Sequence, residues 1–313
     1  EILYRRKNRK SPGEVEVAMA GSSVSWRQSV SRQYKSDPDL RTAIHFSAGS
    51  VVVGVGCSLC WSLLSRSFFA VFAVNLLSSV FIARRVTLNP SIAIQAAFIG
   101  FVFGCSLTTS ALAETDGTWL FSLYVFVLCI FHFTEFFFTA ITNRRGLQAD
   151  SFLLNHSVAY WAAAFFGWTE FVLEQYFTPF MKVTWIGGMG LCLCFCGELL
   201  RKTGMLHAGS AFTHRLALTK RPDHRLCTSG VYAWVHHPGY LGWFLWSIGT
   251  QIVLCNPLSA VAYCLASWKF FNERIFDEEY DLIKLFGDQY LQYQSGVWIG
   301  IPFVSGYHPT IAN

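Results

Sequence analysis

Long apolar segments recur along the chain, and they constrain its fold more than any other feature. Six of them cover approximately residues 45–64, 67–83, 90–113, 119–142, 151–176 and 181–200. A helix needs about 17–25 apolar residues to span the hydrocarbon core of a bilayer, so each segment is long enough. Two shorter segments, 238–255 and 258–273, have the pattern of a helical hairpin that turns at Asn256-Pro257. We therefore expect an all-α, polytopic membrane protein with about eight transmembrane helices.

The charge content supports a lipid environment. Only 14% of the 313 residues are charged and 53% are hydrophobic, whereas soluble domains carry about 25% charged residues. The net charge of +5 raises the question of a nucleic-acid partner. The basic residues, however, lie in short segments between the apolar stretches, which is a topology signal and not a phosphate-binding face. We expect contact with the lipid bilayer and no nucleic acid.

Basic residues also predict the orientation. Alternate connecting segments carry nearly all of them, and the opposite set carries only Arg66 and Lys182. The side rich in arginine and lysine is cytosolic by the positive-inside rule, so both termini are expected there. The sequence then divides into a basic cytosolic arm (1–43), six transmembrane helices (44–200) and a C-terminal catalytic region (201–313). That last region contains cofactor-binding loops, the hairpin at about 238–273 and a cytosolic helix.

Ten cysteines raise the possibility of disulfides or a metal site. Nine of them lie inside apolar runs. Cys57 and Cys60 have C-x2-C spacing, but no second pair completes a tetrahedral site. We interpret the cysteines as small apolar side chains and predict no metal.

Polar residues concentrate after residue 200, in segments 201–237 and 272–295. The first contains five histidines and the second a run of acidic residues. Because the apolar hairpin joins them, the two segments should meet at one face of the membrane. A polar pocket beside lipid suits a reaction between a water-soluble reagent and a lipid-borne substrate.

The residue types at this junction suit a cationic cofactor and an anionic substrate. Gly230 would allow close backbone approach to a ligand, and Tyr232 and Tyr240 offer aromatic faces to a cation. The guanidinium of Arg274 suits a carboxylate, and Glu278 lies one turn further on the same helix face. Spacing alone leaves open a second interpretation, in which Arg274 and Glu278 form an exposed ion pair on a solvated acidic face.

Several motifs, in order, resemble the isoprenylcysteine carboxyl methyltransferase family. They are HRLCTSGVYAWVHHPGYLGW (224–243), WSIGTQIVLCNP (246–257), WKFFNERIFDEE (268–279) and FGDQYLQY (286–293). Upstream, FHFTEF (131–136) and GELLRKTG (197–204) are also similar, so the likeness covers roughly residues 90–304. The His-Pro-x-Tyr-x-Gly element is shared more widely, with membrane methyltransferases that act on phospholipids.

The resemblance implies an endoplasmic reticulum membrane enzyme that uses S-adenosylmethionine to methylate the C-terminal carboxylate of prenylated CaaX proteins, such as small GTPases. It places Arg274 at the substrate and, with Glu278, at the catalytic site. The positions that match the family's cofactor-binding residues are His224, Arg225, Leu226, Cys227, Tyr232, His237, Pro238, Gly239, Tyr240 and Glu278. An α-carboxylate is ionised at neutral pH, so we expect direct transfer of the methyl group with no general base.

The chain departs from the family pattern at several positions. The family commonly has arginine in place of His236, glutamine in place of Ala217 and valine in place of Cys227. It also has Asn-Phe-Asn-His where this chain has Ala-Phe-Thr-His at 211–214. A neutral His236 would remove one positive charge beside the cofactor.

Three alternatives remain: a phospholipid methyltransferase, an NADPH-dependent membrane sterol reductase, and a transporter or scaffold. The sequence shows no internal repeat of the kind common in transporters. Carboxylates inside predicted spans are often functional. We expect Glu170 and Glu198 to be structural and Glu135, which lies in a shared motif, to be the exception. Gly100 and Gly104 form a GxxxG pair that would let two helices approach closely.

Overall fold

The computed structural model describes residues 30–59, 68–154, 157–212 and 225–309. These residues are mostly helical, and the β-type contact found among them is a single bridge between Val235 and Trp298. The predicted all-α class is confirmed. The longer helices are α2 (Pro38–Leu59), α4 (Phe68–Val86), α5 (Pro90–Ala111), α6 (Asp116–Thr142), α7 (Val158–Phe177), α8 (Thr184–Ala208), α9 (Pro238–Val253), α10 (Pro257–Phe286) and α11 (Asp288–Gly296).

The predicted apolar segments coincide in order with α2 and α4–α10. The helix boundaries differ because backbone hydrogen bonding continues into polar sequence. Thus α2 begins at Pro38, inside the predicted arm, and α10 continues beyond residue 273 to Phe286. Within the described ranges, α2, α5 and α6 are long and apolar enough to cross a membrane. The count of about eight spans stays a prediction.

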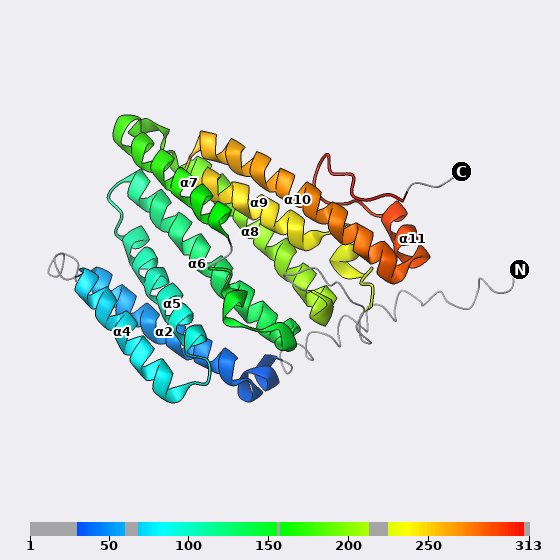
Figure 1. Ribbon diagram of the computed structural model, residues 1–313. Coiled ribbons are helices and arrows are strands. Elements are labelled where there is room, and N and C mark those ends of the chain that lie inside the picture. Colours follow the sequence, from blue (N-terminus) through cyan, green and yellow to red (C-terminus); the bar gives the residue numbers. More distant parts are fainter. Residues whose placement is uncertain (1–29, 60–67, 155–156, 213–224, 310–313) are drawn as a thin grey trace, which may run out of the picture.

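The helices form one bundle (Figure 1). Helices α2, α4 and α5 lie at one side, and α8, α9 and α10 lie at the other, with α6 between the two groups. Contacts link α2 with α5, α5 with α6, α6 with α8, α8 with α9, and α9 with α10. The short helix α11 follows α10 at the end of the bundle where the C-terminal segment also lies.

Glycines bring two helix pairs into backbone contact. A Cβ atom at Gly100 would lie 2.2 Å from the carbonyl oxygen of Ser47 on α2, so the predicted close approach by the GxxxG pair is confirmed. Gly197 on α8 and Gly242 on α9 face each other in the same way, because a Cβ atom on either would lie 2.5 Å from the other's carbonyl oxygen. The second contact fixes the beginning of α9 against α8.

Candidate active site

The hairpin of α9 and α10 brings the two polar segments together, as predicted. Asn256 and Pro257 form its turn, and Pro257 is the first residue of α10. Tyr240, in the first turn of α9, donates its hydroxyl hydrogen to the carboxylate of Glu278 on α10. The same hydroxyl oxygen accepts a hydrogen bond of 3.2 Å from Nε of Arg274. Three residues that were predicted separately therefore form one contact group.

A polar cavity opens beside this group. Most of the predicted cofactor residues line it, namely Arg225, Leu226, Cys227, Tyr232, His237, Pro238, Gly239, Tyr240 and Glu278. His224 and Ala217 lie outside the described residues. The roles assigned to the lining residues stay predictions, but their common location agrees with a single binding site.

Gly230 and Arg274 do not line this cavity in the structure. Gly230 adopts a positive φ of 63°, and a Cβ atom there would lie 2.0 Å from Cδ2 of His207. Glycine is therefore needed for the turn that packs on the end of α8, which is a structural explanation for its presence. Arg274 reaches the edge of the cavity through the Tyr240 hydroxyl.

The sequence analysis missed part of the lining. Asp281, Leu282 and Leu285 project from α10 into the same cavity as Glu278. Their spacing from Glu278 is three, four and seven residues, which is one face of a helix. This periodicity would have separated Asp281 from the solvated acidic residues nearby. Phe212, four residues after the end of α8, and Tyr290 and Tyr293 on α11 add aromatic side chains to the lining.

Glu279 lies beside the cavity and is fully buried. Burial alone would raise the pKa of its carboxyl group, but the imidazoles of His236 and His237 and the backbone N–H of Tyr307 outweigh burial and lower this pKa to about 2. Its oxygens accept hydrogen bonds from His237 Nε2 at 3.3 Å and from the Tyr290 hydroxyl at 3.2 Å. An ionised Glu279 thus holds α11 and the C-terminal segment against α10.

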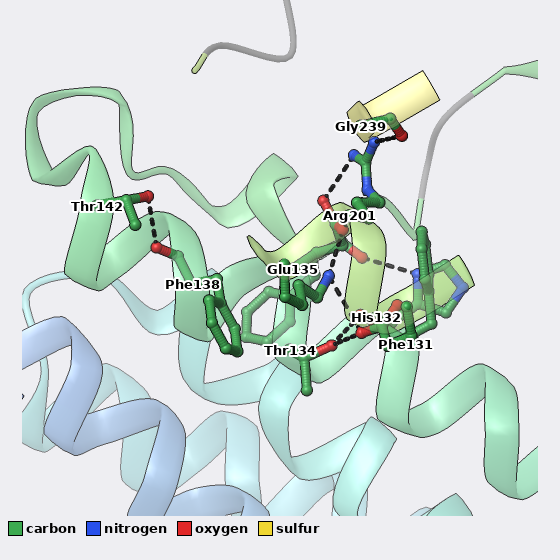
Figure 2. Close-up of polar contacts among 11 residues, drawn as sticks. Phe131, His132, Thr134, Glu135, Phe138, Thr142, Arg201 and Gly239 are labelled. Atoms are coloured by element: carbon green, nitrogen blue, oxygen red, sulfur yellow. Dashed lines mark hydrogen bonds and ion pairs between the residues drawn. The ribbon is translucent and has the colours of Figure 1, made fainter. Parts of the chain in front are cut away.

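A second group of charged residues is buried between α6 and α8 (Figure 2). Glu135 is fully buried and accepts hydrogen bonds from Nε and Nη2 of Arg201, at 2.6 and 2.9 Å, and from Nζ of Lys202. Nη1 of Arg201 donates to the carbonyl oxygen of Gly239, at 2.9 Å. Glu135 therefore positions the first turn of α9, where the polar cavity begins.

The other two carboxylates in predicted spans have structural contacts. Glu198 accepts a hydrogen bond from Thr134 and pairs with Lys202 at 3.2 Å. Glu170 accepts hydrogen bonds of 2.7 and 2.6 Å from the backbone N–H groups of Leu258 and Ser259. Glu170 therefore satisfies the first turn of α10, where a helix needs acceptors.

An apolar cavity of about 430 Å³ lies among α6, α7, α9 and α10. Its lining includes Tyr124, Tyr160, Trp243 and Phe270. Aromatic contacts connect it to the polar residues above, because Phe271 touches both Trp243 and Tyr240, with ring centroids 5.4 and 5.1 Å apart. A polar cavity and an apolar cavity therefore lie on either side of one group of aromatic rings.

Comparison with known proteins agrees with this geometry. Residues 189–284 match the model of the isoprenylcysteine carboxyl methyltransferase family. Protein-S-isoprenylcysteine O-methyltransferase of Xenopus laevis is 50% identical over 217 residues, which are 69% of this chain and 74% of that protein. The human protein of the same name is 48% identical over 217 residues, covering 69% of this chain and 75% of its own length.

A solved structure is also similar. It is described as the eukaryotic intramembrane Ras methyltransferase ICMT, and it aligns with a TM-score of 0.82 and 42% identity. The alignment covers 87% of this chain and 100% of the other. Identity and coverage at this level show a common family and a common fold, so this integral membrane protein belongs to the isoprenylcysteine carboxyl methyltransferase family.

Proposed function

We propose that this protein transfers the methyl group of S-adenosylmethionine to the C-terminal α-carboxylate of a prenylated cysteine. A bond forms between a carboxylate oxygen and the methyl carbon as the carbon–sulfur bond breaks. The products are a methyl ester and S-adenosylhomocysteine. The observation that carries the proposal is the hydrogen bond of Arg274 to Tyr240, which lines the polar cavity. Along α10, Arg274 lies between Phe270, which lines the apolar cavity, and Glu278, which lines the polar one.

The polar cavity suits the cofactor, which supplies an electrophilic methyl group on a positively charged sulfur. Aromatic faces attract cations, and Tyr232 and Tyr293 both line the cavity. Glu278 and Asp281 add carboxylates on the α10 side. Leu282 supplies an apolar wall next to these charges. These lining residues therefore fit a ligand that combines a cationic centre with aromatic and polar groups.

Arg274 is the proposed residue for the substrate carboxylate. A planar guanidinium can bind both oxygens of a carboxylate and so fix its orientation. The hydrogen bond from Arg274 Nε to Tyr240 orients the guanidinium plane. Tyr240 also contacts Glu278, so one hydroxyl links the substrate side of the site to the cofactor side.

The apolar cavity suits the prenyl chain. Ligand pockets commonly have volumes of about 300–1,000 Å³, and this one has about 430 Å³. Burial of an apolar chain contributes about 0.8 kcal/mol per CH₂ group. The cavity lies among helices, so a lipid chain would reach it from the bilayer while the cofactor arrives from water. Trp243 and Phe271 would then lie between the prenyl chain and the reacting carboxylate.

The reaction needs alignment more than acid–base chemistry. The carboxylate is already ionised at neutral pH, because α-carboxyl pKa values are about 3.5. Holding the two reactants in line can lower the barrier by about 7–11 kcal/mol. Opposite charges on the two reactants neutralise each other during transfer, and this favours an environment of low dielectric constant. Arg274 must therefore orient the carboxylate without quenching its nucleophilicity.

The proposed location follows from charge and family. We assign the protein to the endoplasmic reticulum membrane, with about eight spans and with both termini and the polar cavity facing the cytosol. The positive-inside distribution of arginine and lysine supports this orientation. The protein substrates would be processed CaaX proteins, such as small GTPases, whose prenylated C-termini lie in the same membrane.

The test is transfer of labelled methyl from S-adenosylmethionine to N-acetyl-farnesylcysteine by the purified full-length chain in lipid–detergent micelles. We expect activity in the wild type, loss of it in Arg274→Ala and Glu278→Ala, and retention in Lys284→Ala. Lys284 is a matched control because it is a basic residue on α10 whose ammonium lies over Tyr280, away from the site.

Other outcomes would contradict the proposal. Cofactor binding with no transfer to the prenylcysteine, together with transfer to phosphatidylethanolamine, would identify a phospholipid methyltransferase. Thermal stabilisation by NADPH and not by S-adenosylhomocysteine would favour the reductase alternative, because a ligand stabilises the state that binds it.

A further inference from the structure

Two histidines and one glutamate converge beside the polar cavity. Consecutive residues His236 and His237 precede α9, and Glu279 lies on α10, at a separation of more than 40 positions in sequence. All three side chains are buried. One potential ligand atom from each lies within 4.8 Å of the others.

The distances match those of metal ligands. Donor atoms of a tetrahedral Zn²⁺ site, with bonds of about 2.0–2.1 Å, lie about 3.3–3.4 Å apart. His237 Nε2 lies 3.3 Å from Glu279 Oε1, and His236 Nδ1 lies 3.4 Å from the same oxygen. The third pair of donors, one nitrogen from each imidazole, lies within 4.8 Å, with the ring centroids 6.0 Å apart.

The buried imidazole of His236 gives a second indication of a metal site. Its side chain is 3% exposed, and neither ring nitrogen makes a hydrogen bond within the described part of the chain. A buried imidazole normally has a hydrogen-bonding partner, so two such nitrogens need an explanation. Nδ1 lies 3.4 Å from Glu279 Oε1, but the geometry is not that of a hydrogen bond. A metal ion would give this nitrogen the partner it lacks.

The surroundings resemble the outer layer of a metal site. Ligating carboxylates are usually hydrogen-bonded in turn, and Oε2 of Glu279 accepts two hydrogen bonds of 2.9 Å, from Gln294 Nε2 and Tyr307 N. Ligating histidines usually direct their second nitrogen at an acceptor. Nδ1 of His237 has the Glu278 carboxylate nearby, at 4.0 Å, which is beyond hydrogen-bond distance. Both histidines line the polar cavity, which gives an ion a path from water.

We propose that His236, His237 and Glu279 form a binding site for one divalent transition-metal ion such as Zn²⁺. The ligand set of two imidazoles and one carboxylate is typical of sites that leave a fourth position for water or a ligand. Calcium and magnesium are excluded as preferred ions because they favour oxygen ligands. The proposal goes beyond the methyl-transfer function and is tested without an activity assay.

The test is equilibrium dialysis of tag-free, metal-stripped protein in detergent against Zn²⁺, with the metal content measured by mass spectrometry. We expect one ion per chain in the wild type. In His236→Arg we expect at least about tenfold weaker binding, since a ligand is lost. This variant places a guanidinium beside Glu279, so the buried carboxylate retains a partner. His45→Arg is the matched control, because His45 is exposed and lies on α2, and it should bind as the wild type does.

Replacement of Zn²⁺ by Co²⁺ in the wild type gives a second readout that needs no variant. Visible absorption bands of four-coordinate Co²⁺ with nitrogen and oxygen ligands are expected. A sulfur-to-cobalt charge-transfer band would assign the ion to cysteines and overturn the proposal. Absence of stoichiometric binding, or equal binding by wild type and folded His236→Arg, would overturn it as well.

Discussion

Two charged groups in this protein differ in how completely the chain surrounds them. The side chain of Glu135 is 0% exposed and is held by Arg201 and Lys202. Glu278 is 29% exposed and borders the polar cavity together with Tyr240. The inner group is closed by other protein groups, whereas the outer group has a side open to a ligand. We therefore expect the inner charges to position the site and the outer charges to contact what binds there.

Physical chemistry explains why the inner group must be complete. A buried charge is costly unless opposite charges and hydrogen bonds surround it, and removal of one partner leaves the others uncompensated. Glu135 and Glu198 together face two cations, so the group is balanced. Outer residues such as Arg274 are half-buried, so their removal costs less stability. Substitutions in the inner group should therefore lower stability, and substitutions in the outer group should lower activity.

The largest effect is expected from Glu135→Gln. This change leaves Arg201 and Lys202 buried without their main counter-charge, so the free energy of unfolding should fall by about 3–5 kcal/mol. Thermal or denaturant unfolding in detergent measures the loss. Glu114→Gln, at an exposed position between α5 and α6, is the control and should change little. An unchanged midpoint for Glu135→Gln would mean that the inner group does not support the fold.

Arg274→Lys should lower activity strongly and leave stability almost unchanged. It keeps the charge but loses the planar fork, so misalignment of the carboxylate should lower kcat/KM about a hundredfold. The unfolding midpoint should stay close to that of the wild type. Steady-state kinetics with N-acetyl-farnesylcysteine, beside a thermal melt, gives both quantities. A large loss of stability with normal kcat/KM would place Arg274 with the inner group.

Tyr240→Phe is expected to have a smaller effect. The ring still stacks on His237, but the hydroxyl that joins Arg274 to Glu278 is lost. Hydrogen bonds to charged groups are worth about 1.5–3 kcal/mol, and we expect a loss at the lower end of this range, which corresponds to about tenfold in kcat/KM. Separate titrations of cofactor and prenylcysteine measure the effect on each KM. If the KM for only one of the two substrates changes, the hydroxyl does not link the cofactor side of the site to the prenylcysteine side.

The smallest effect is expected from Glu170→Gln. The amide keeps one acceptor for the first turn of α10 but loses the negative charge at the helix N-terminus, a loss of about 1 kcal/mol of stability. Thermal or denaturant unfolding in detergent, as for Glu135→Gln, measures this loss of stability. At temperatures where the variant is folded, kcat/KM should equal that of the wild type. A drop in kcat/KM there would show that this distant end of α10 influences the chemistry.

The sequence predicted the helices well because their signal is local. Apolar runs of about 20 residues identified α2 and α4–α10, and Asn256-Pro257 located the hairpin turn. Helix ends were less predictable, since the sequence becomes polar near residue 272 whereas α10 continues to Phe286. Hydropathy describes the environment of a helix, while backbone hydrogen bonding determines its length.

The site was predicted in part, for a similar reason. Motif residues such as Tyr232, Tyr240 and Glu278 were found because they lie in continuous patterns and do line the cavity. The contact of Glu135 with Arg201 joins residues 66 positions apart, and nothing in either segment alone specifies the partner. The convergence of His236 on Glu279 was hidden in the same way, because it depends on how the hairpin closes.

The unbroken course of α10 has a consequence for substrate choice. From Pro257 to Arg274 the helix rises about 26 Å, at 1.5 Å per residue, a length close to the hydrocarbon thickness of about 30 Å. Glu170 on α7 holds the first turn of α10, so in the predicted span the arginine would lie at a fixed height relative to the bilayer. With Arg274 at the substrate carboxylate, as proposed above, we expect acceptors to be selected by depth: a carboxylate would be methylated when its lipid tail holds it at the level of that guanidinium, whatever protein it terminates.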